Sequence, residues 1–340
     1  MTDFNQKAKA DWFDLVPKLE LHIHLEGAIP LSTLWQLVQK YGGDSDVPDE
    51  RALREKFTYV DFPHFIDTWI WKNQFLREYE DFSLIAEAVA REQAKQNICY
   101  TEAFYSPPDF VRHGIRTQEL TEAIRKGLAK VPEVEIALVA DLVRDFGPDK
   151  AAVTLAEVQE VQDRGVIGIG IGGSEQDFPP EEFEQVFKNA RDMGFRTSAH
   201  AGEASGAASI RAAIDHLHVD RIGHGTRAKE DPALVEYLAE RKIPLEVCPT
   251  SNVCAGVIST FRDHPVREYM NAGLIITINT DDPVMFDTNL AQEFRLLESK
   301  FDLDREDIRN LILQAIESSW MPLERKQIFR NDFQSDPAWR

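Results

Sequence analysis

Histidines and carboxylate residues occur together in four short motifs that are spread along the chain. The motifs are His22-Ile-His24, His200-Ala-Gly-Glu203, Gly223-His224-Gly225 and Asn279-Thr280-Asp281-Asp282-Pro283. Imidazole nitrogens and carboxylate oxygens suit zinc, and a catalytic zinc site keeps one position open for water. Three imidazoles and one carboxylate would complete such a set, which predicts one zinc ion per chain. The candidate ligands are His22, His24, His200 and Asp281.

Three further ionisable residues in these motifs are candidates for acid and base catalysis. Bound zinc lowers the pKa of its water, and a neighbouring base is needed to orient and deprotonate that water. His224 and Asp282 are the candidates for this base. Attack on an aromatic ring carbon also requires protonation of the adjacent ring nitrogen, which favours Glu203 as the acid. The alternative for Glu203 is a solvated residue that opens the next helix, where a negative charge is favourable.

The spacing of His22 and His24 has chemical meaning only if the pair lies on a strand. Residues i and i+2 of a strand point to the same side, so both imidazoles would converge. Polar packing is the alternative for an isolated pair. His216-Leu-His218 has the same spacing but follows a helical stretch, where residues two apart do not share a face, so we predict a surface pair. Surface or packing positions are predicted for His64, His113, His216, His218 and His264.

Eight short apolar runs alternate with polar, helix-like stretches, and each motif ends or follows one of these runs. The runs are Leu19–His24, Ile98–Tyr105, Val134–Asp141, Val166–Ile171, Arg196–His200, Arg221–His224, Ile243–Cys248 and Leu274–Thr280. Strand–helix alternation repeated eight times predicts an α/β fold, a (β/α)8 TIM barrel. Catalytic residues of such barrels lie at the C-terminal ends of several strands, so we expect the four motifs to meet at one rim.

Helix signals are clearest in two stretches outside the apolar runs. Glu181–Met193 carries an apolar face at 3.6-residue spacing before Gly194, and Asp231–Arg241 begins with an aspartate N-cap followed by Pro232. The stretch between the first two strands is too long for one crossover helix and contains the aromatic segment Phe62–Phe75. We predict a helical insertion over the barrel mouth, either a solvent-excluding lid or a packed accessory helix pair.

Length and composition indicate a globular protein of one domain. The chain has 340 residues, of which 43% are hydrophobic and 28% charged, and barrels of this size form one domain, here residues 1–340. The net charge of −20 would repel a nucleic-acid backbone and disfavour phosphorylated ligands. The 3 cysteines lack CxxC spacing, and neither an apolar leader nor a membrane-spanning apolar run is seen. We expect a cytoplasmic protein without nucleic-acid or membrane partners.

The motifs LELHIHLEG, SAHAGE, RIGHG, CPTSN and NTDDP follow one another between Pro17 and about Lys326. In this order, and on these strands, they resemble the adenosine/AMP deaminase family of the metal-dependent amidohydrolase superfamily. The resemblance implies a barrel with one zinc ion, bound by His22, His24, His200 and Asp281. It also implies attack of water on a 6-aminopurine, with a 6-oxopurine and ammonia as products.

The same resemblance implies roles for the other motif residues. Glu203 is expected to protonate N1 of the purine, His224 to orient and deprotonate the water, and Asp282 to assist near the water and N7. The backbone N–H of Gly173 is expected to bind N3. Contacts with the small purine substrate are expected from His24, Glu26 and Gly173, with Glu26 on the sugar side.

Two positions differ from typical adenosine deaminases. Glu26 stands where they have aspartate, and Gly173-Ser174-Glu175 stands where they have Gly-Asp-Glu. Both differences are similar to adenine deaminases and to enzymes acting on aminofutalosine-type nucleosides, whereas RIGHG and NTDDP are closer to the adenosine group. Our main prediction is deamination of adenosine or 2′-deoxyadenosine to inosine or 2′-deoxyinosine. The alternatives are a deaminase of adenine or of a modified adenine nucleoside, and a catalytically silent barrel that only binds.

Overall fold

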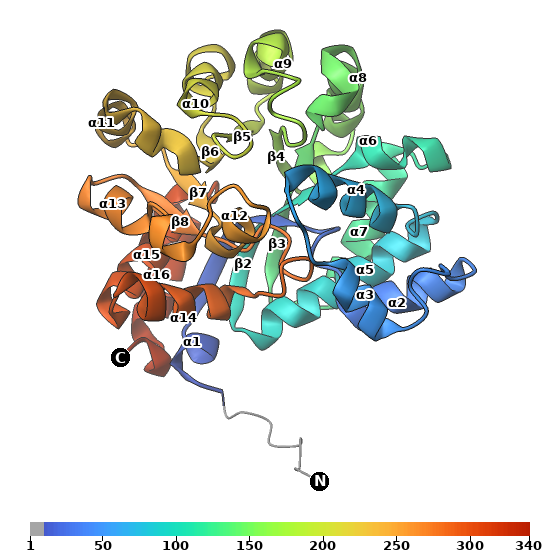
Figure 1. Cartoon of the computed structure of the whole chain (residues 1–340), viewed down its shortest axis with the longest axis horizontal. Coiled ribbons are helices and arrows are strands. Elements are labelled where there is room, and N and C mark those ends of the chain that lie inside the picture. Colours follow the sequence, from blue (N-terminus) through green and yellow to red (C-terminus); the bar gives the residue numbers. More distant parts are fainter. Residues whose placement is uncertain (1–9) are drawn as a thin grey trace.

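Eight parallel strands form one sheet whose order follows the sequence, β1 to β8 (Figure 1). The computed structural model describes residues 10–340. The expectation that the N-terminal segment holds no apolar leader concerns residues 1–9 in part, and these lie outside the described range. The strands are β1 Lys18–His24, β2 Ile98–Tyr105, β3 Glu135–Asp141, β4 Val166–Gly170, β5 Arg196–Ala201, β6 Arg221–His224, β7 Leu245–Val247 and β8 Ile276–Ile278. Each coincides with one of the predicted apolar runs.

The sheet curves until its first strand reaches the segment that follows β8. Ile23 pairs there with Asp281 in parallel. The N–H of His24 donates to the Asp281 carbonyl at 2.8 Å, and the N–H of Asp281 donates to the His22 carbonyl at 3.1 Å. Because these bonds join the two edges, the strands form a barrel with helices around it (Figure 1). The predicted (β/α)8 TIM barrel is confirmed.

The seventh and eighth predicted runs extend furthest beyond the strands that the structure contains. Ile243–Cys248 was expected where β7 covers Leu245–Val247, and Leu274–Thr280 where β8 covers Ile276–Ile278. Cys248 and Leu274 are nevertheless buried. The apolar pattern therefore marks burial in the barrel wall, which extends beyond the few residues that pair in the ladder.

Helices cover the outside of the barrel and connect successive strands. Those of 6 residues or more after β2 are α7 Thr117–Leu128, α8 Gly147–Gln159, α9 Glu184–Asp192, α10 Ala207–Ala212, α11 Pro232–Arg241, α12 Pro249–Cys254, α13 Val266–Asn271, α14 Leu290–Phe301, α15 Arg305–Ser318 and α16 Leu323–Ser335. Shorter helical segments include α1 Trp12–Leu15, α6 Pro107–Phe110, η1 Val111–His113 and η2 Arg144–Phe146.

Both stretches with clear helix signals are helical. The stretch Glu181–Met193 begins as the 3-10 helix η4 Pro180–Phe183 and continues as α9, with Gly194 in the left-handed region (φ +86°) after it. In the other stretch, the Asp231 side chain accepts the N–H of Ala233 at 3.0 Å and caps α11. The pair His216 and His218 lies at the end of the π-helix η5 Ala213–Leu217. His216 is half-buried and His218 is exposed, which confirms a surface position.

Four helices lie between β1 and β2, which confirms the predicted helical insertion. They are α2 Leu31–Lys40, α3 Glu50–Lys56, α4 Phe62–Asn73 and α5 Tyr79–Lys95. The Asp61 side chain accepts the N–H of His64 at 2.9 Å and starts α4. α5 packs against β2 and α7 as an outer helix, whereas α4 crosses the C-terminal end of the barrel in front of the strands (Figure 1).

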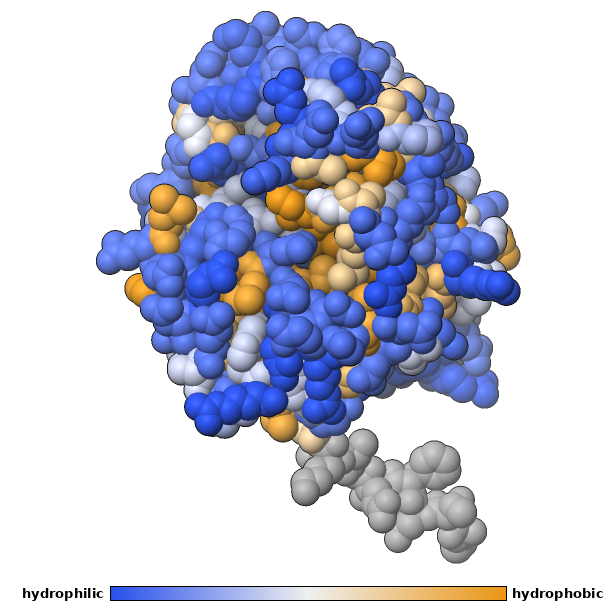
Figure 2. All heavy atoms as spheres, turned by 90° about the vertical axis from the view of Figure 1, so that its left-hand side faces the viewer, coloured by the Kyte–Doolittle hydropathy of each residue, from blue (hydrophilic) through white to orange (hydrophobic). Residues whose placement is uncertain are grey.

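The surface of the protein is largely polar. Hydrophilic residues cover most of the face drawn in Figure 2, and hydrophobic residues gather mainly toward its middle. Within residues 10–340, none of the helices combines the length and the apolar character needed to cross a bilayer.

Candidate active site

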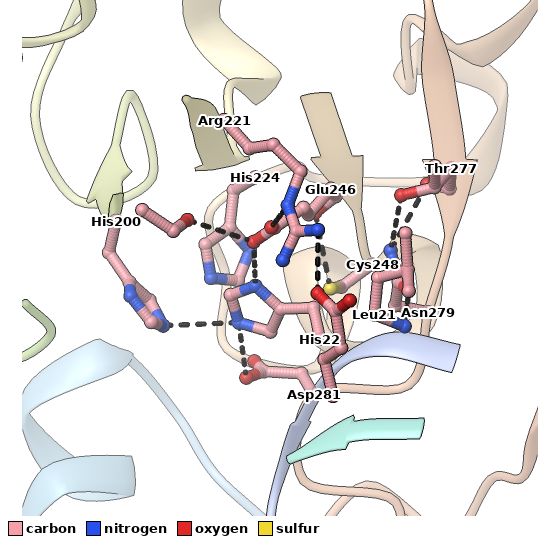
Figure 3. Close-up of polar contacts among 12 residues, drawn as sticks. Leu21, His22, His200, Arg221, His224, Glu246, Cys248, Thr277, Asn279 and Asp281 are labelled. Atoms are coloured by element: carbon pink, nitrogen blue, oxygen red, sulfur yellow. Dashed lines mark hydrogen bonds and ion pairs between the residues drawn. The ribbon is translucent and has the colours of Figure 1, made fainter. Parts of the chain in front are cut away.

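Four of the predicted side chains converge at the C-terminal end of the barrel. His22 and His24 lie two residues apart on β1. His22, His200 on β5 and Asp281 after β8 point toward one another (Figure 3). His200 Nε2 lies 3.1 Å from His22 Nε2 and 3.2 Å from His24 Nε2. Asp281 Oδ1 lies 3.4 Å from His22 Nε2 and 3.3 Å from His24 Nε2. All four side chains are buried.

These spacings fit a zinc ion. Bonds of about 2.0–2.1 Å in a tetrahedral arrangement place the ligand atoms about 3.3 Å apart, and an imidazole–carboxylate set suits zinc. Three ring nitrogens in mutual contact would repel one another unless a proton or a cation lay between them. His224 is also near: its ring nitrogen joins His22, His200 and Asp281 within 4.8 Å. It stands beside the set, on the side that faces Glu203.

The backbone is strained at two of these positions. His224 has φ +61° and Asp281 has φ +65°, both in the left-handed region that residues other than glycine seldom adopt. Such strain is retained where the surrounding structure over-determines the conformation, and it is concentrated at functional sites. The two side chains are thus held at orientations that a regular strand end would not give them.

Contacts behind the ligands fix their orientation. His22 Nδ1 lies 2.7 Å from Glu246 Oε2, and Ser251 Oγ donates to Asp281 Oδ2 at 2.6 Å. Burial lowers the pKa of His22, but its hydrogen bonds with Asp281 and Glu246 outweigh burial and raise the pKa to about 9. Carboxylate partners of this kind set the tautomer of a metal-binding histidine. Sequence reasoning missed Glu246, although a glutamate between Leu245 and Val247 in a buried strand is a signal.

Glu246 is itself held by a buried arginine. Arg221 Nε donates to Glu246 Oε1 at 2.5 Å (Figure 3). Arg221 Nη1 lies 2.6 Å from Glu102 Oε2. The guanidinium also stacks on the Trp320 ring, 3.7 Å from its centroid. Burial raises the pKa of Glu246, but the charge of Arg221 and the contacts with His22 together outweigh burial, and the pKa falls to about 2. The ligand set thus rests on a charged layer inside the barrel.

Glu203 is buried beside the ligand set. Its backbone N–H donates to Glu175 Oε2 at 3.1 Å, and the N–H of Gly202 donates to Glu175 Oε1 at 2.6 Å. Burial, together with the charges of Asp281 and Glu175, raises the pKa of Glu203 well above its usual range. The next helix, α10, begins only at Ala207, so the alternative of a solvated helix-opening residue is wrong. A buried, protonated carboxyl suits a hydrogen-bond donor.

His224 faces Glu203 on one side and a polar chain on the other. Its Nε2 lies 3.4 Å from Glu203 Oε2, and its Nδ1 lies 3.1 Å from Asn252 Nδ2. Asn252 Oδ1 accepts the Thr226 hydroxyl at 2.8 Å and lies 3.1 Å from His264 Nε2. His264 is therefore a buried packing residue, as predicted, but its contact with Asn252 connects it to His224. Sequence reasoning missed Asn252, although it stands in CPTSN.

Asp282 lies against the first strand's end. A Cβ on Gly27 would lie 1.6 Å from Asp282 Oδ1, so only glycine permits this approach. Asp282 Oδ1 is buried and makes no hydrogen bond within residues 10–340. Burial, and next the charge of Asp281, raise the pKa of Asp282 to about 8. Asp282 also lines the cavity that the site opens into.

A cavity of about 230 Å³ connects the ligand set with solvent. Its apolar wall comes from α4, through Phe62, Phe65, Ile66, Trp69 and Ile70, and from Val143 and Phe146 on the far side. Its polar wall includes Asp109, Asp141 and Asp145, and no lysine or arginine lines it among the described residues. Gly173 lines it too, at φ +103°. A largely apolar cavity with a few polar groups is typical of a small-molecule site.

Glu26 does not line this cavity. Its carboxylate accepts the backbone N–H of Ser106 at 3.0 Å, and Lys72 Nζ donates to its carbonyl at 2.9 Å. Asp109 stands on the cavity wall nearby, held by Trp69 Nε1 at 3.0 Å and Asn73 Nδ2 at 2.9 Å. A direct sugar contact from Glu26 therefore stays a prediction, while Asp109, which no motif indicates, is a carboxylate on the cavity wall. His64 is not among the lining residues either.

Barrels that end in such a ligand set activate water with a metal, and the fold and site place this chain among the metal-dependent amidohydrolases. The chain belongs to the adenosine deaminase family, whose model matches residues 17–335. It is 36% identical to aminodeoxyfutalosine deaminase of Streptomyces avermitilis over 90% of this chain and 87% of that protein. It is 35% identical to adenine deaminase of Bordetella avium over 91% of this chain and 98% of that protein.

Solved structures of related proteins share the whole barrel. Adenine deaminase from Arthrobacter aurescens superposes with a TM-score of 0.89 at 29% identity, covering 94% of this chain and 98% of that chain. An amidohydrolase from Burkholderia ambifaria with bound zinc superposes with a TM-score of 0.87 at 30% identity, covering 97% of this chain and 94% of that chain. The predicted family is thereby confirmed.

Proposed function

We propose that this protein hydrolytically deaminates an adenine-type substrate at C6, with one zinc ion. The observation that carries the proposal is the convergence of His22, His24, His200 and Asp281 beside the buried carboxyl of Glu203. When bound by these four side chains, zinc acts as a Lewis acid that makes water a stronger nucleophile. The oxygen of water bonds to C6, the bond from C6 to the exocyclic nitrogen breaks, and ammonia leaves.

The remaining side chains supply protons and orientation. Glu203 donates its proton to the ring nitrogen next to C6, which makes that carbon electrophilic. His224 orients the water and takes its proton, and Asp282, which lines the cavity, assists near the water and the five-membered ring. His24 and the backbone N–H of Gly173, both on the cavity wall, hold the purine plane.

The comparisons favour adenine, or an adenine nucleoside carrying a further group, over adenosine. The most similar relatives reported above are deaminases of aminodeoxyfutalosine and of adenine. Our main prediction of adenosine or 2′-deoxyadenosine is therefore replaced by its alternative. The acidic lining of the cavity, with Asp109, Asp141 and Asp145, further disfavours a phosphate next to the sugar.

A substrate panel tests this function. Zinc-loaded protein is incubated with adenine, adenosine, 2′-deoxyadenosine, AMP and a 5′-substituted adenosine, and loss of the 6-amino chromophore is followed. We expect kcat/KM to be highest for adenine or the 5′-substituted nucleoside and lowest for AMP. Glu203→Gln should keep its zinc and lose roughly 100-fold to 10,000-fold in kcat, as expected for a lost acid. Deamination of none of these compounds would overturn the proposal in favour of a silent binding barrel.

A matched control separates the acid role from a general effect of the substitution. Glu182→Gln makes the same chemical change at an exposed position in η4, and we expect its kcat to equal that of the unaltered protein. Full activity of Glu203→Gln would contradict the assignment of the acid.

A further inference from the structure

Arg144, in η2 after β3, is a fully buried arginine close to the active site. Its Nη2 donates to the His200 carbonyl at 2.6 Å and to the Ile171 carbonyl at 3.4 Å. Its Nη1 donates to the Phe178 carbonyl at 2.9 Å. One guanidinium therefore joins the end of β5 to both ends of the loop that follows β4, residues 171–178 (the β4 loop).

The β4 loop contributes to the active site in two ways. Gly172 and Gly173 line the catalytic cavity. Further along the loop, the Glu175 carboxylate accepts the backbone N–H groups of Gly202 and Glu203 at 2.6 and 3.1 Å. Because Glu203 is the proposed acid, the position of the β4 loop determines where that acid stands relative to the cavity wall.

The backbone of η2 and the side chain after Arg144 hold the same loop. The N–H of Arg144 donates to the Gly172 carbonyl at 2.9 Å, and Asp145 Oδ2 accepts the N–H of Ser174 at 2.8 Å. A Cβ on Gly173 would lie 1.9 Å from Asp145 Oδ2, so only glycine permits this approach. The β4 loop and η2 are thus packed together as one unit.

This arrangement costs free energy. Val143, directly before Arg144, has φ +49°, a left-handed value that is rare for a β-branched residue. The guanidinium is withdrawn from water, and its hydrogen bonds go to neutral carbonyls, although burying a charge is expensive. Backbone strain of this kind is concentrated at functional sites, where the surrounding structure maintains it. The cost indicates that the contact between η2 and the β4 loop serves the reaction.

A second arginine makes the same kind of contact at the opposite end of the barrel. Arg125 on α7 is half-buried and donates to the carbonyls of Ile136 and Gly165 at 2.6 and 2.7 Å, and also to that of Arg164. Ile136 lies near the start of β3, and Gly165 precedes β4. This contact therefore joins the N-terminal ends of two strands, whereas catalytic residues lie at the C-terminal ends.

We propose that Arg144 is a positioning residue for the deamination, which fixes the β4 loop against the end of β5 so that Glu203 and Gly173 face the substrate together. Arg144 is not among the residues that line the cavity; it acts through the His200 backbone and through Glu175. Misplacing a reacting group by about 1 Å can cost roughly 100-fold in rate. This inference rests on the proposed function and adds the residue that holds its acid in place.

Arg144→Met tests the proposal in zinc-loaded protein with the best 6-aminopurine of the substrate panel. We expect kcat to fall roughly 100-fold, while KM and zinc content change much less. Hydrogen exchange at the amides of Gly202 and Glu203 should become faster, because Glu175 is no longer held in place. Arg125→Met is the matched control: it should lower the midpoint of thermal unfolding but leave kcat and the exchange of these two amides unchanged.

Arg144→Lys decides the question if Arg144→Met does not fold. An ammonium group keeps the charge but lacks the planar fork that reaches several carbonyls at once, so kcat should lie between those of Arg144→Met and the unaltered protein. Full kcat in Arg144→Met, or in Arg144→Lys where the first variant is unfolded, would overturn the proposal, as would an equal loss in Arg125→Met.

Failure of the proposed function would be seen separately. In that case the unaltered protein would deaminate no 6-aminopurine, whatever the variants do. Hydrogen exchange at Gly202 and Glu203 needs no turnover, so it would still show whether Arg144 holds the β4 loop. Unchanged exchange at both amides in Arg144→Met would contradict that role even if the protein proved to be an active deaminase.

Discussion

The orientation of one amide decides which nitrogen of His224 carries the proton. Asn252 Oδ1 accepts the Thr226 hydroxyl at 2.8 Å and lies 3.1 Å from His264 Nε2. Its amide nitrogen is therefore the group that faces His224 Nδ1 at 3.1 Å, which makes Nδ1 an acceptor. Neutral His224 then carries its proton on Nε2, toward the reacting centre. For His224 to accept a proton there, the amide must turn.

His264 has the means to permit that turn. Its Nδ1 is buried and has no hydrogen-bond partner within the described residues, and burial lowers the pKa of His264 to about 3, so the ring is neutral. If the amide nitrogen faced His264, the His264 proton would move from Nε2 to Nδ1, and Asn252 Oδ1 would accept a hydrogen bond from the Nδ1–H of His224. Asn252 is thus a positioning residue whose orientation couples two histidines.

Replacing Asn252 tests this coupling. Asn252→Leu removes both amide groups, so neither tautomer of His224 is favoured, and we expect kcat to fall roughly 100-fold, the lower end of the contribution of a positioned acid or base. KM and zinc content should change little. ¹⁵N spectra of labelled histidines should show one His224 tautomer before the substitution and two after it. Thr121→Val, which removes a buried hydroxyl on α7 that contacts Tyr105 rather than Asn252, is the control; an equal loss in that variant would argue against the coupling.

At the scale of elements, α4 shows how one helix serves two purposes. Trp69 faces the cavity, where its Nε1 donates to Asp109 Oδ2 at 3.0 Å and its ring lies 5.8 Å from that of His24. Trp71, two residues later, faces the other way and donates to Asp44 Oδ2 at 2.7 Å. Residues two apart on a helix do not share a face. One face of α4 thus closes the site, while the opposite face packs against the rest of the insertion.

This division of faces predicts different effects for two similar substitutions. Trp69→Leu opens the cavity wall and should raise KM roughly 30-fold, because truncating a tryptophan that forms part of a binding contact costs about 2 kcal/mol or more. Trp71→Leu should lower the midpoint of thermal unfolding but leave KM within about twofold. Steady-state kinetics and thermal unfolding of both variants measure this. Equal KM values for the two would show that α4 does not form the wall in solution.

The elements could largely be predicted from the sequence, but their contacts could not. The eight apolar runs and the insertion follow from local patterns, because burial of a parallel strand and the periodicity of a helix are local properties. The contact of Trp69 with Asp109, and the place of Glu26 behind the wall, depend on how α4 lies across the barrel. Nothing within either segment specifies that crossing.

At the scale of the whole molecule, buried charges connect strands that are distant in sequence. Glu102 on β2, Arg221 on β6 and Glu246 on β7 meet inside the barrel only because the sheet closes. The four ligand motifs could be recognised without the structure, since each is a short pattern of ionisable residues at a strand end. The charged layer beneath them could not, because Glu102 and Glu246 are isolated ionisable residues in their strands and nothing in RIGHG indicates that Arg221 contacts them.

Removing the arginine should therefore affect both stability and metal binding. Arg221→Met leaves Glu102 and Glu246 as buried carboxylates without their cation, which should lower the free energy of unfolding by about 3–5 kcal/mol. Because Glu246 orients His22, zinc affinity should also fall roughly 10-fold to 100-fold. Urea unfolding and competition with a chelator measure the two effects.

Two further variants define how that result is interpreted. Arg91→Met removes an exposed arginine that pairs with Glu87 on α5 at 2.8 Å, and it should cost about 1 kcal/mol or less. Adding Glu102→Gln to Arg221→Met removes one of the two unpaired carboxylates and should recover part of the lost stability, while zinc affinity stays low because Glu246 still lacks its cation. If Arg221→Met unfolded at the same urea concentration as Arg91→Met, the buried charges would not stabilise the contact between opposite strands of the barrel. The orientation of His22 would then have to come from the metal and from Asp281 alone.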